Sequence, residues 1–190
     1  LGVQVEVYTW SEADVGVADA KPGESISIVV MSQCDLLTKW VNIWKEKGRR
    51  IIPNCVSPLP PGAVLLDEKD MPLGLFHEEA RHHIGVVRYA ITWTRGSDLG
   101  YAGSLLSALV NHWTERADML LTRTISYVAA TLNLSEYHIV STKEAKLGLM
   151  QRVETDASHA GHADMRGQQC ISIEIRAAAE QSITRVHPVF

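Results

Sequence analysis

The sequence lacks three features that would assign it directly to a class of protein: paired cysteines, an excess of positive charge and a long apolar run. It has three cysteines and no CxxC pair, so neither a disulfide framework nor a cysteine zinc site is indicated. The 18 Lys and Arg residues stand against 22 Asp and Glu residues, so bulk charge alone does not draw the chain to nucleic acid. No stretch approaches the roughly 20 apolar residues that a membrane span requires.

The first residues, LGVQVEVYTW, lack the basic start and apolar middle of a signal peptide, and no Met precedes them. The chain opens inside a strand-like pattern, so we expect a fragment or a processed piece of a longer protein. Apolar residues make up 46% of the chain and charged residues 21%. This composition is sufficient for a buried core in one large or two small domains.

Two strands and a helix are predicted in the first quarter of the chain. Apolar and polar residues alternate in VQVEVY, and SISIVVM resumes an apolar strand pattern, which together predict a hairpin with a long loop. Helical spacing follows from Asp35, and Gly48 is placed to end that helix. The apolar residues that predict its buried face are Leu36, Leu37, Trp40, Val41 and Trp44.

The middle of the chain predicts a proline-rich connection and then three helices. Four prolines in IIPNCVSPLPPGAVLL exclude a continuous helix, so this segment is predicted to link or to wrap. Helical patterns cover residues 78–93, 98–112 and 114–132, and Thr114 is a predicted N-cap for the last. YHIV, LGLMQRVETDAS and CISIEI then predict a sheet of short strands, with a domain boundary near residues 141–148.

Seven blocks stand in an order that resembles the polymerase polyprotein of copia-type retrotransposons. The blocks are LGVQVEV, SISIVVMSQ, a Leu-rich helix, VSPLPPG, HHIGVVRYAITWTRGSDLGYAGSLLSALV, ISYVAATLNL and VETDASHAGHADMRG. The resemblance covers nearly the whole chain, from the end of the reverse transcriptase palm into the start of RNase H. One departure lies in TRGSD, where Gly96 and Ser97 replace the proline that the family usually carries.

The resemblance implies an α+β chain: a β-hairpin with helical thumb and connection, followed by an incomplete RNase H-like sheet. Residues 1–140 would form the primer-grip hairpin, thumb and connection, and residues 149–190 the first part of the RNase H domain. Leu1 and Gly2 would belong to the primer grip, which holds the growing 3′ end. Phosphate contacts are expected from the basic residues of the helix that follows, with Arg49 and Arg50 first, then Lys45, Lys39 and Lys47. The alternative is a solvated helix face, because Glu46 interrupts the cluster.

Asp156 matches the carboxylate that the first strand of an RNase H sheet supplies to Mg²⁺. Such enzymes use two divalent ions about 4 Å apart, and these hard cations require several carboxylates. Glu174 and Glu180 lie outside the family's pattern, so Asp156 is the one predicted catalytic and metal-binding residue. A turn or cap is the structural alternative for an Asp at this position. We therefore expect this chain alone to cut nothing.

Histidines give weaker indications of a site. His159 and His162, with Asp164 nearby, have zinc-like spacing, but a solvated loop explains them better because no Cys lies close. His77, His82 and His83 stand in a helical stretch, where exposed or hydrogen-bonded histidines are ordinary.

For the parent polyprotein the resemblance implies RNA-directed DNA synthesis and degradation of hybrid RNA with Mg²⁺. The palm's paired aspartates would lie upstream, so this part would grip the RNA–DNA hybrid or template–primer duplex beside the rest of the polyprotein, with no membrane partner. Its expected location is cytoplasmic, in the element's virus-like particle, with the nucleus as a second location. The alternatives are a non-enzymatic remnant acting as an interaction module, and a nuclease built on Asp156, Glu174 and Glu180.

Overall fold

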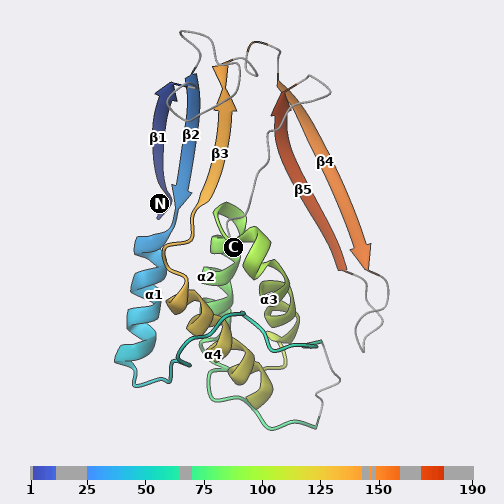
Figure 1. The fold of residues 1–190 in the computed structure, drawn as a ribbon. Helices are drawn as coiled ribbons and strands as arrows, with labels where there is room; N and C mark the ends of the chain where they lie inside the picture. Colours follow the sequence, from blue (N-terminus) through green and yellow to red (C-terminus); the bar gives the residue numbers. More distant parts are fainter. Residues whose placement is uncertain are drawn as a thin grey trace. The chain divides into compact units, whose positions relative to one another are not determined.

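The computed structural model describes residues 2–11, 25–64, 70–142, 146, 149–158 and 168–177, the last two ranges as backbone. The chain forms two compact units, a helical unit built mainly on Ser32–Ser135 and a strand unit (Figure 1). Four helices and a three-stranded sheet within the described ranges confirm the α+β class. Both units are discontinuous in sequence, because the chain leaves the strand unit at Met31 and returns at Glu136. The family-based division into residues 1–140 and 149–190 stays a prediction.

Helix α1 (Cys34–Glu46) confirms the predicted amphipathic helix. Leu37, Trp40, Val41 and Trp44 are all buried, at the spacing that places them on one face. The helix ends as predicted at Gly48, whose φ of 69° suits a residue without a Cβ, and whose N–H donates to the Lys45 carbonyl. Both tryptophans therefore belong to the core, as their position beside the leucines predicted.

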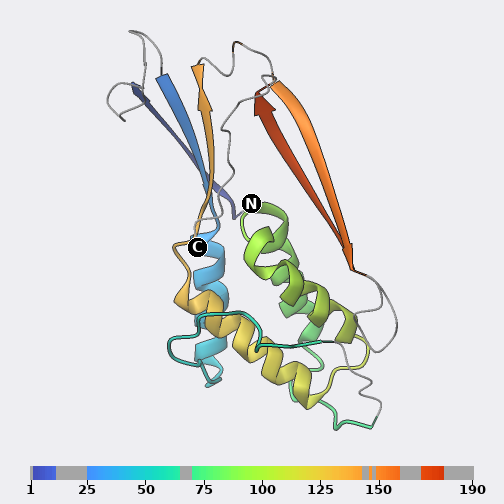
Figure 2. The ribbon, with the colours of Figure 1, turned by 45° about the vertical axis from the view of Figure 1, so that its right-hand side comes forward.

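The three further helices of the helical unit agree with the predicted ones to within a few residues at each end. They are α2 (Ala80–Trp93), α3 (Gly96–Leu109) and α4 (Glu115–Ala130). Helix α2 packs mainly on α3, while α4 packs on both α1 and α3 (Figure 2). The close α2–α3 contact is possible because Gly103 faces Ile91, whose Cδ1 would lie 2.3 Å from an added Cβ.

Thr114 is the N-cap of α4, as predicted. Its hydroxyl accepts a hydrogen bond from the Ala117 N–H at 3.3 Å. Glu115 and Asp118 place two carboxylates in the first turn, where the helix dipole favours negative charge. Asp118 also accepts from the indole N–H of Trp113, so the start of α4 is fixed by its own side chains.

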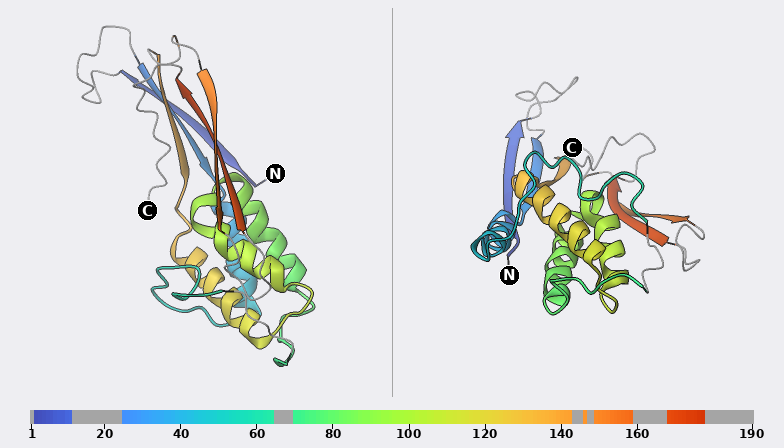
Figure 3. Two further views of the ribbon diagram at one scale, coloured as in Figure 1. Left: turned by 90° about the vertical axis from the view of Figure 1, so that its right-hand side faces the viewer. Right: turned by 90° about the horizontal axis from the view of Figure 1, so that it is seen from below.

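The proline-rich segment, residues 51–64, wraps along the helical unit without forming a helix, as the sequence predicted (Figure 3). We call it the strap. Its carbonyl groups accept hydrogen bonds from helix side chains: the Thr124 hydroxyl donates to Pro58, and the Tyr101 hydroxyl to Ala63. Within the strap, Cys55 and Leu59 are buried. The strap is therefore held to α3 and α4 mainly through its backbone.

The strand unit corrects one sequence-based grouping. Strand β3 (Glu136–Ser141) was expected to join the later strands, yet it pairs antiparallel with β2 (Ser25–Ser32), with Ile28 opposite Ile139. Strand β1 (Gln4–Ser11) lies on the other side of β2. Partners separated by more than a hundred residues leave no local signal in the sequence, so periodicity found the strand but not its neighbour.

Strands β4 (Leu149–Ser158) and β5 (Gln168–Ala177) form a separate antiparallel hairpin in the strand unit. The two strands pair along ten positions, from Leu149 opposite Ala177 to Ser158 opposite Gln168. Their extended conformation agrees with the strand patterns of LGLMQRVETDAS and CISIEI.

Candidate nucleic-acid interface

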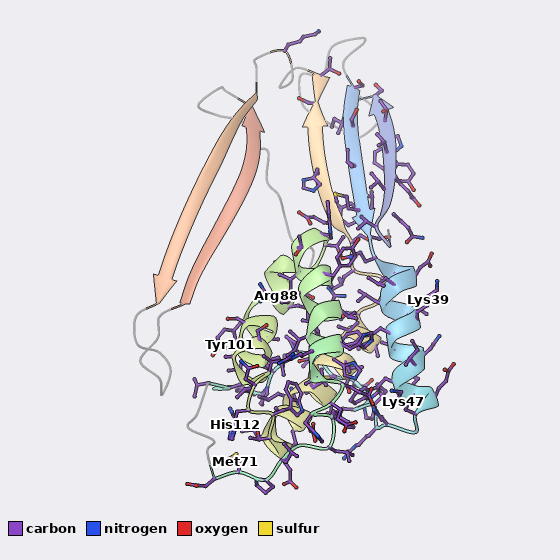
Figure 4. The ribbon with its side chains drawn as sticks, turned by 180° about the vertical axis from the view of Figure 1, so that it is seen from behind. Lys39, Lys47, Met71, Arg88, Tyr101 and His112 are labelled. Carbon is purple, nitrogen blue, oxygen red and sulfur yellow. The ribbon has the colours of Figure 1, made fainter. Side chains whose placement is uncertain are left out.

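Lys45 and Arg50 are exposed at the C-terminal end of α1, where the sequence predicted phosphate contacts. Among the described residues no ion pair engages either side chain. The Arg50 backbone is fixed, because its carbonyl accepts from the indole N–H of Trp44 at 2.9 Å. Lys39 is also exposed on α1, and Figure 4 shows it pointing away from the other helices. These cations are free to meet an anionic partner.

The structure does not bring the predicted primer-grip residues to this end of α1. Leu1 lies outside the described residues. Gly2 has a φ of 80°, and its missing Cβ would lie 3.5 Å from the Leu36 Cβ, at the first turn of α1. Leu36 and Glu46 are separated by roughly 15 Å along the helix axis, because each residue adds about 1.5 Å. Gly2 and Arg50 therefore lie at opposite ends of α1.

Arg49 differs from Lys45 and Arg50 because the helical unit uses its side chain for packing. Its guanidinium carbon lies 4.7 Å from the centre of a Trp44 ring and 4.5 Å from that of Phe76. Its Nη2 donates to Glu79 Oε1 at 2.6 Å, and only 14% of the side chain is exposed. Arg49 thus joins α1 to α2, while its contact with phosphate stays a prediction.

The cluster that Arg49 centres, which we call the α1–α2 junction, was not foreseen from the sequence. Its members are Trp44, Lys47, Arg49, Phe76, Glu79 and His83. Lys47 Nζ lies 2.6 Å from Glu79 Oε2, so one carboxylate holds two cations (Lys47 is labelled in Figure 4). The separation of about 30 residues between Arg49 and Glu79 explains why no sequence pattern signals the pair.

His83 is the buried member of the α1–α2 junction, and its hydrogen bonds define its tautomer. Trp40 donates its indole N–H to His83 Nδ1 at 3.0 Å, so in the neutral ring the proton resides on Nε2. That nitrogen lies 3.5 Å from Glu79 Oε2 and 3.2 Å from Arg49 Nη1. In this tautomer Nε2–H faces both the Glu79 carboxylate and the Arg49 guanidinium. A charged ring would add an Nδ1–H opposite the indole N–H of Trp40 and place a third cation beside Arg49.

The charge states of the junction follow from this arrangement. Burial, followed by the positive charges of His82 and Arg49, lowers the pKa of His83 to about 4. The hydrogen bonds donated by Arg49 and Lys47 lower the pKa of Glu79 to about 2. At neutral pH the carboxylate is ionised and the imidazole is neutral.

We expect the free energy of unfolding to fall by roughly 2 kcal/mol on acidification because of His83 alone. Between about pH 6.5 and about pH 4 the unfolded chain binds a proton on this residue and the folded chain does not. The contribution is therefore complete above the unfolded pKa and is lost as pH falls toward the folded one. Urea unfolding followed by tryptophan fluorescence across this range measures the loss.

The His83→Gln variant keeps an acceptor for Trp40 but cannot titrate, so the His83 part of the loss should vanish. His82→Gln is the matched control, because His82 is exposed and adjacent. It should keep most of the acid sensitivity. If the free energy of unfolding falls equally with pH in wild type and in His83→Gln, protonation of this ring does not cause the loss of stability.

Asp156 lies in β4, opposite Cys170, so its predicted position in a strand is confirmed. Glu174 is opposite Arg152, four positions along β4 from Asp156. At about 3.4 Å per residue, the backbones of Asp156 and Glu174 are roughly 14 Å apart. The two residues therefore stand at different backbone positions along the hairpin, and the nuclease alternative stays a prediction. Glu180, His159, His162 and Asp164 lie outside the described residues.

A Mg²⁺ site of the RNase H kind requires several convergent carboxylates. Across the described part of the chain, no three His, Cys, Asp or Glu side chains gather in a way that could hold a metal. The catalytic and metal-binding role of Asp156 stays a prediction.

Within the described ranges, each helix is too short or too polar to cross a bilayer. No protein-family model, curated protein or solved structure matches the chain.

Proposed function

We propose that this chain is the thumb, connection and opening RNase H hairpin of a copia-like reverse transcriptase. Its role is to hold the primer strand and the RNA–DNA hybrid while catalysis takes place elsewhere in the polyprotein. The observation that carries the proposal is the pair of exposed cations, Lys45 and Arg50, at the end of α1. Both side chains are exposed on the helical unit, in the segment where the resemblance implies that a thumb contacts the duplex.

Two further features support the proposal. A strand pair precedes a helical unit, and an antiparallel hairpin follows it, which is the order that the seven sequence blocks imply. Asp156 lies in the first strand of that hairpin, as the leading carboxylate of an RNase H sheet does. Mg²⁺, where the complete domain holds it, would activate water and stabilise the leaving oxygen.

The test is binding of a labelled RNA–DNA hybrid across a salt series. Each phosphate contact contributes about 0.9 to the slope of log affinity against log salt, so Lys45→Ala with Arg50→Ala should reduce the slope by roughly 2. Arg49→Ala is unsuitable as the first variant because it also unpacks Trp44 and Phe76. Circular dichroism should show that the helices of the double variant are retained.

The control is Arg88→Ala, which removes a positive charge from an exposed position on α2, nine residues beyond Glu79. It should leave the slope nearly unchanged. With Mg²⁺ or Mn²⁺ the wild-type chain should cut the RNA strand no faster than the Asp156→Asn variant does, because neither chain is expected to cut it. Absence of hybrid binding at low salt would contradict the grip and favour the non-enzymatic interaction module.

A further inference from the structure

Three nitrogen groups, two from the segment that follows α1 and one from α2, converge on the carboxylate of Glu79. Lys47 Nζ lies 2.6 Å from Oε2, Arg49 Nη2 lies 2.6 Å from Oε1, and His83 Nε2 lies 3.5 Å from Oε2. Lysine and arginine are the side chains that bind phosphate most often, and a guanidinium presents its donors in a fixed plane. The same three groups would suit the oxygens of a phosphate.

The donor groups of Arg49 and His83 are held rigidly by aromatic side chains, whereas the side of the cluster with Lys47 and Glu79 is open to solvent. The guanidinium of Arg49 packs against both the Trp44 ring and the Phe76 ring, and Trp40 fixes the ring of His83. Lys47 is 45% exposed and Glu79 35% exposed, so the carboxylate side faces solvent. An anion can therefore reach the donors where Glu79 now lies.

We propose that Glu79 occupies, with its own carboxylate, a phosphate-binding site formed by Lys47, Arg49 and His83, and that it competes there with the backbone of the hybrid. This inference rests on the proposed function, since it concerns the regulation of the same duplex-binding face. It gives Glu79 a restraining role: duplex binding is weaker while the carboxylate stays in place.

The position of Glu79 suits a group that can be displaced. It is the residue before α2, yet its side chain makes no capping hydrogen bond to the helix. The Lys47–Glu79 pair is exposed at both side chains and therefore weak, so a competing phosphate would meet least resistance on that side. Because the pKa of Glu79 is lowered to about 2, acidification near neutrality does not release it, and a second anion is the agent that can.

Glu79→Gln tests the proposal on the full chain with the same labelled hybrid. Removing the competing charge should raise affinity at low salt about tenfold and steepen the salt slope by about 1, because Lys47 becomes available. Glu78→Gln is the matched control: Glu78 is the adjacent exposed carboxylate, and no ion pair among the described residues involves it. It removes the same charge and should change neither quantity.

A double-mutant cycle tests whether Lys47 is the cation that Glu79→Gln releases from its ion pair. Lys47→Ala should reduce the affinity of the Glu79→Gln chain about tenfold, yet change that of the wild type less than twofold or so. Circular dichroism of each variant shows that the helices are retained.

The outcomes separate this inference from the function on which it rests. Hybrid binding by the wild type, with Glu79→Gln and Glu78→Gln indistinguishable, would overturn the restraining role and leave the grip intact. Tighter binding by Glu79→Gln than by Glu78→Gln would support the restraint. No binding by either chain would overturn both.

Discussion

Replacing Arg95 with methionine should destabilise the helical unit by about 3–5 kcal/mol, because it leaves the Asp98 carboxylate without its partner inside the protein. Arg95 is 1% exposed, and its Nε and Nη2 donate to one Asp98 oxygen at 2.8 and 2.6 Å. The same guanidinium donates to the Thr131 carbonyl and hydroxyl. It therefore ties the turn between α2 and α3 to the end of α4.

Urea unfolding followed by circular dichroism measures this loss. Arg88→Met is the control, because Arg88 is exposed on α2 (Figure 4), and its effect should stay within about 0.5 kcal/mol. Adding Asp98→Leu to Arg95→Met should recover part of the stability, since no unpaired charge then remains. A loss below about 1 kcal/mol for Arg95→Met, like that of an exposed pair, would show that this bridge is not essential.

The second large effect is expected at Trp44. Trp44→Ala should lower the free energy of unfolding by about 4 kcal/mol, in the range for large buried aromatic residues. The indole is 1% exposed and meets the Phe76 ring edge-on at 4.8 Å between ring centres. The substitution also removes the ring beneath Arg49 and the N–H that holds the Arg50 carbonyl.

Trp93→Ala is the matched control, since Trp93 is 45% exposed at the end of α2. It should cost less than about 1 kcal/mol. Trp44→Phe gives an intermediate measurement if the alanine variant does not fold, because it retains a ring but not the indole N–H. Equal losses at Trp44 and Trp93 would show that burial at the α1–α2 junction contributes little.

Much of the helical unit could be predicted because its determinants are local. The spacing of Trp40 and Trp44 defines one helix face, Gly48 supplies the conformation that ends α1, and Thr114 supplies the cap that begins α4. The proline-rich strap was predicted not to be helical for an equally local reason, the missing N–H groups of its prolines. These features need only a few neighbouring residues.

Features that depend on distant partners were not predictable. Nothing in YHIV indicates that β3 pairs with β2, and nothing in TRGSD shows that Arg95 meets Thr131. Lys45 and Arg50, two members of the basic group predicted at the end of α1, are exposed there. The separation of Arg49 from that group depends on Glu79, far along the chain, and the use of any of these residues by nucleic acid stays a prediction.

The strap has a consequence for how this sequence can vary. The carbonyl groups of Pro58, Ala63 and Val64 accept hydrogen bonds from Thr124, Tyr101 and Arg116. A main-chain acceptor is present whatever side chain its residue carries, so replacements at these three strap positions can leave the attachments unchanged. The restriction on replacement lies instead with the donors on α3 and α4.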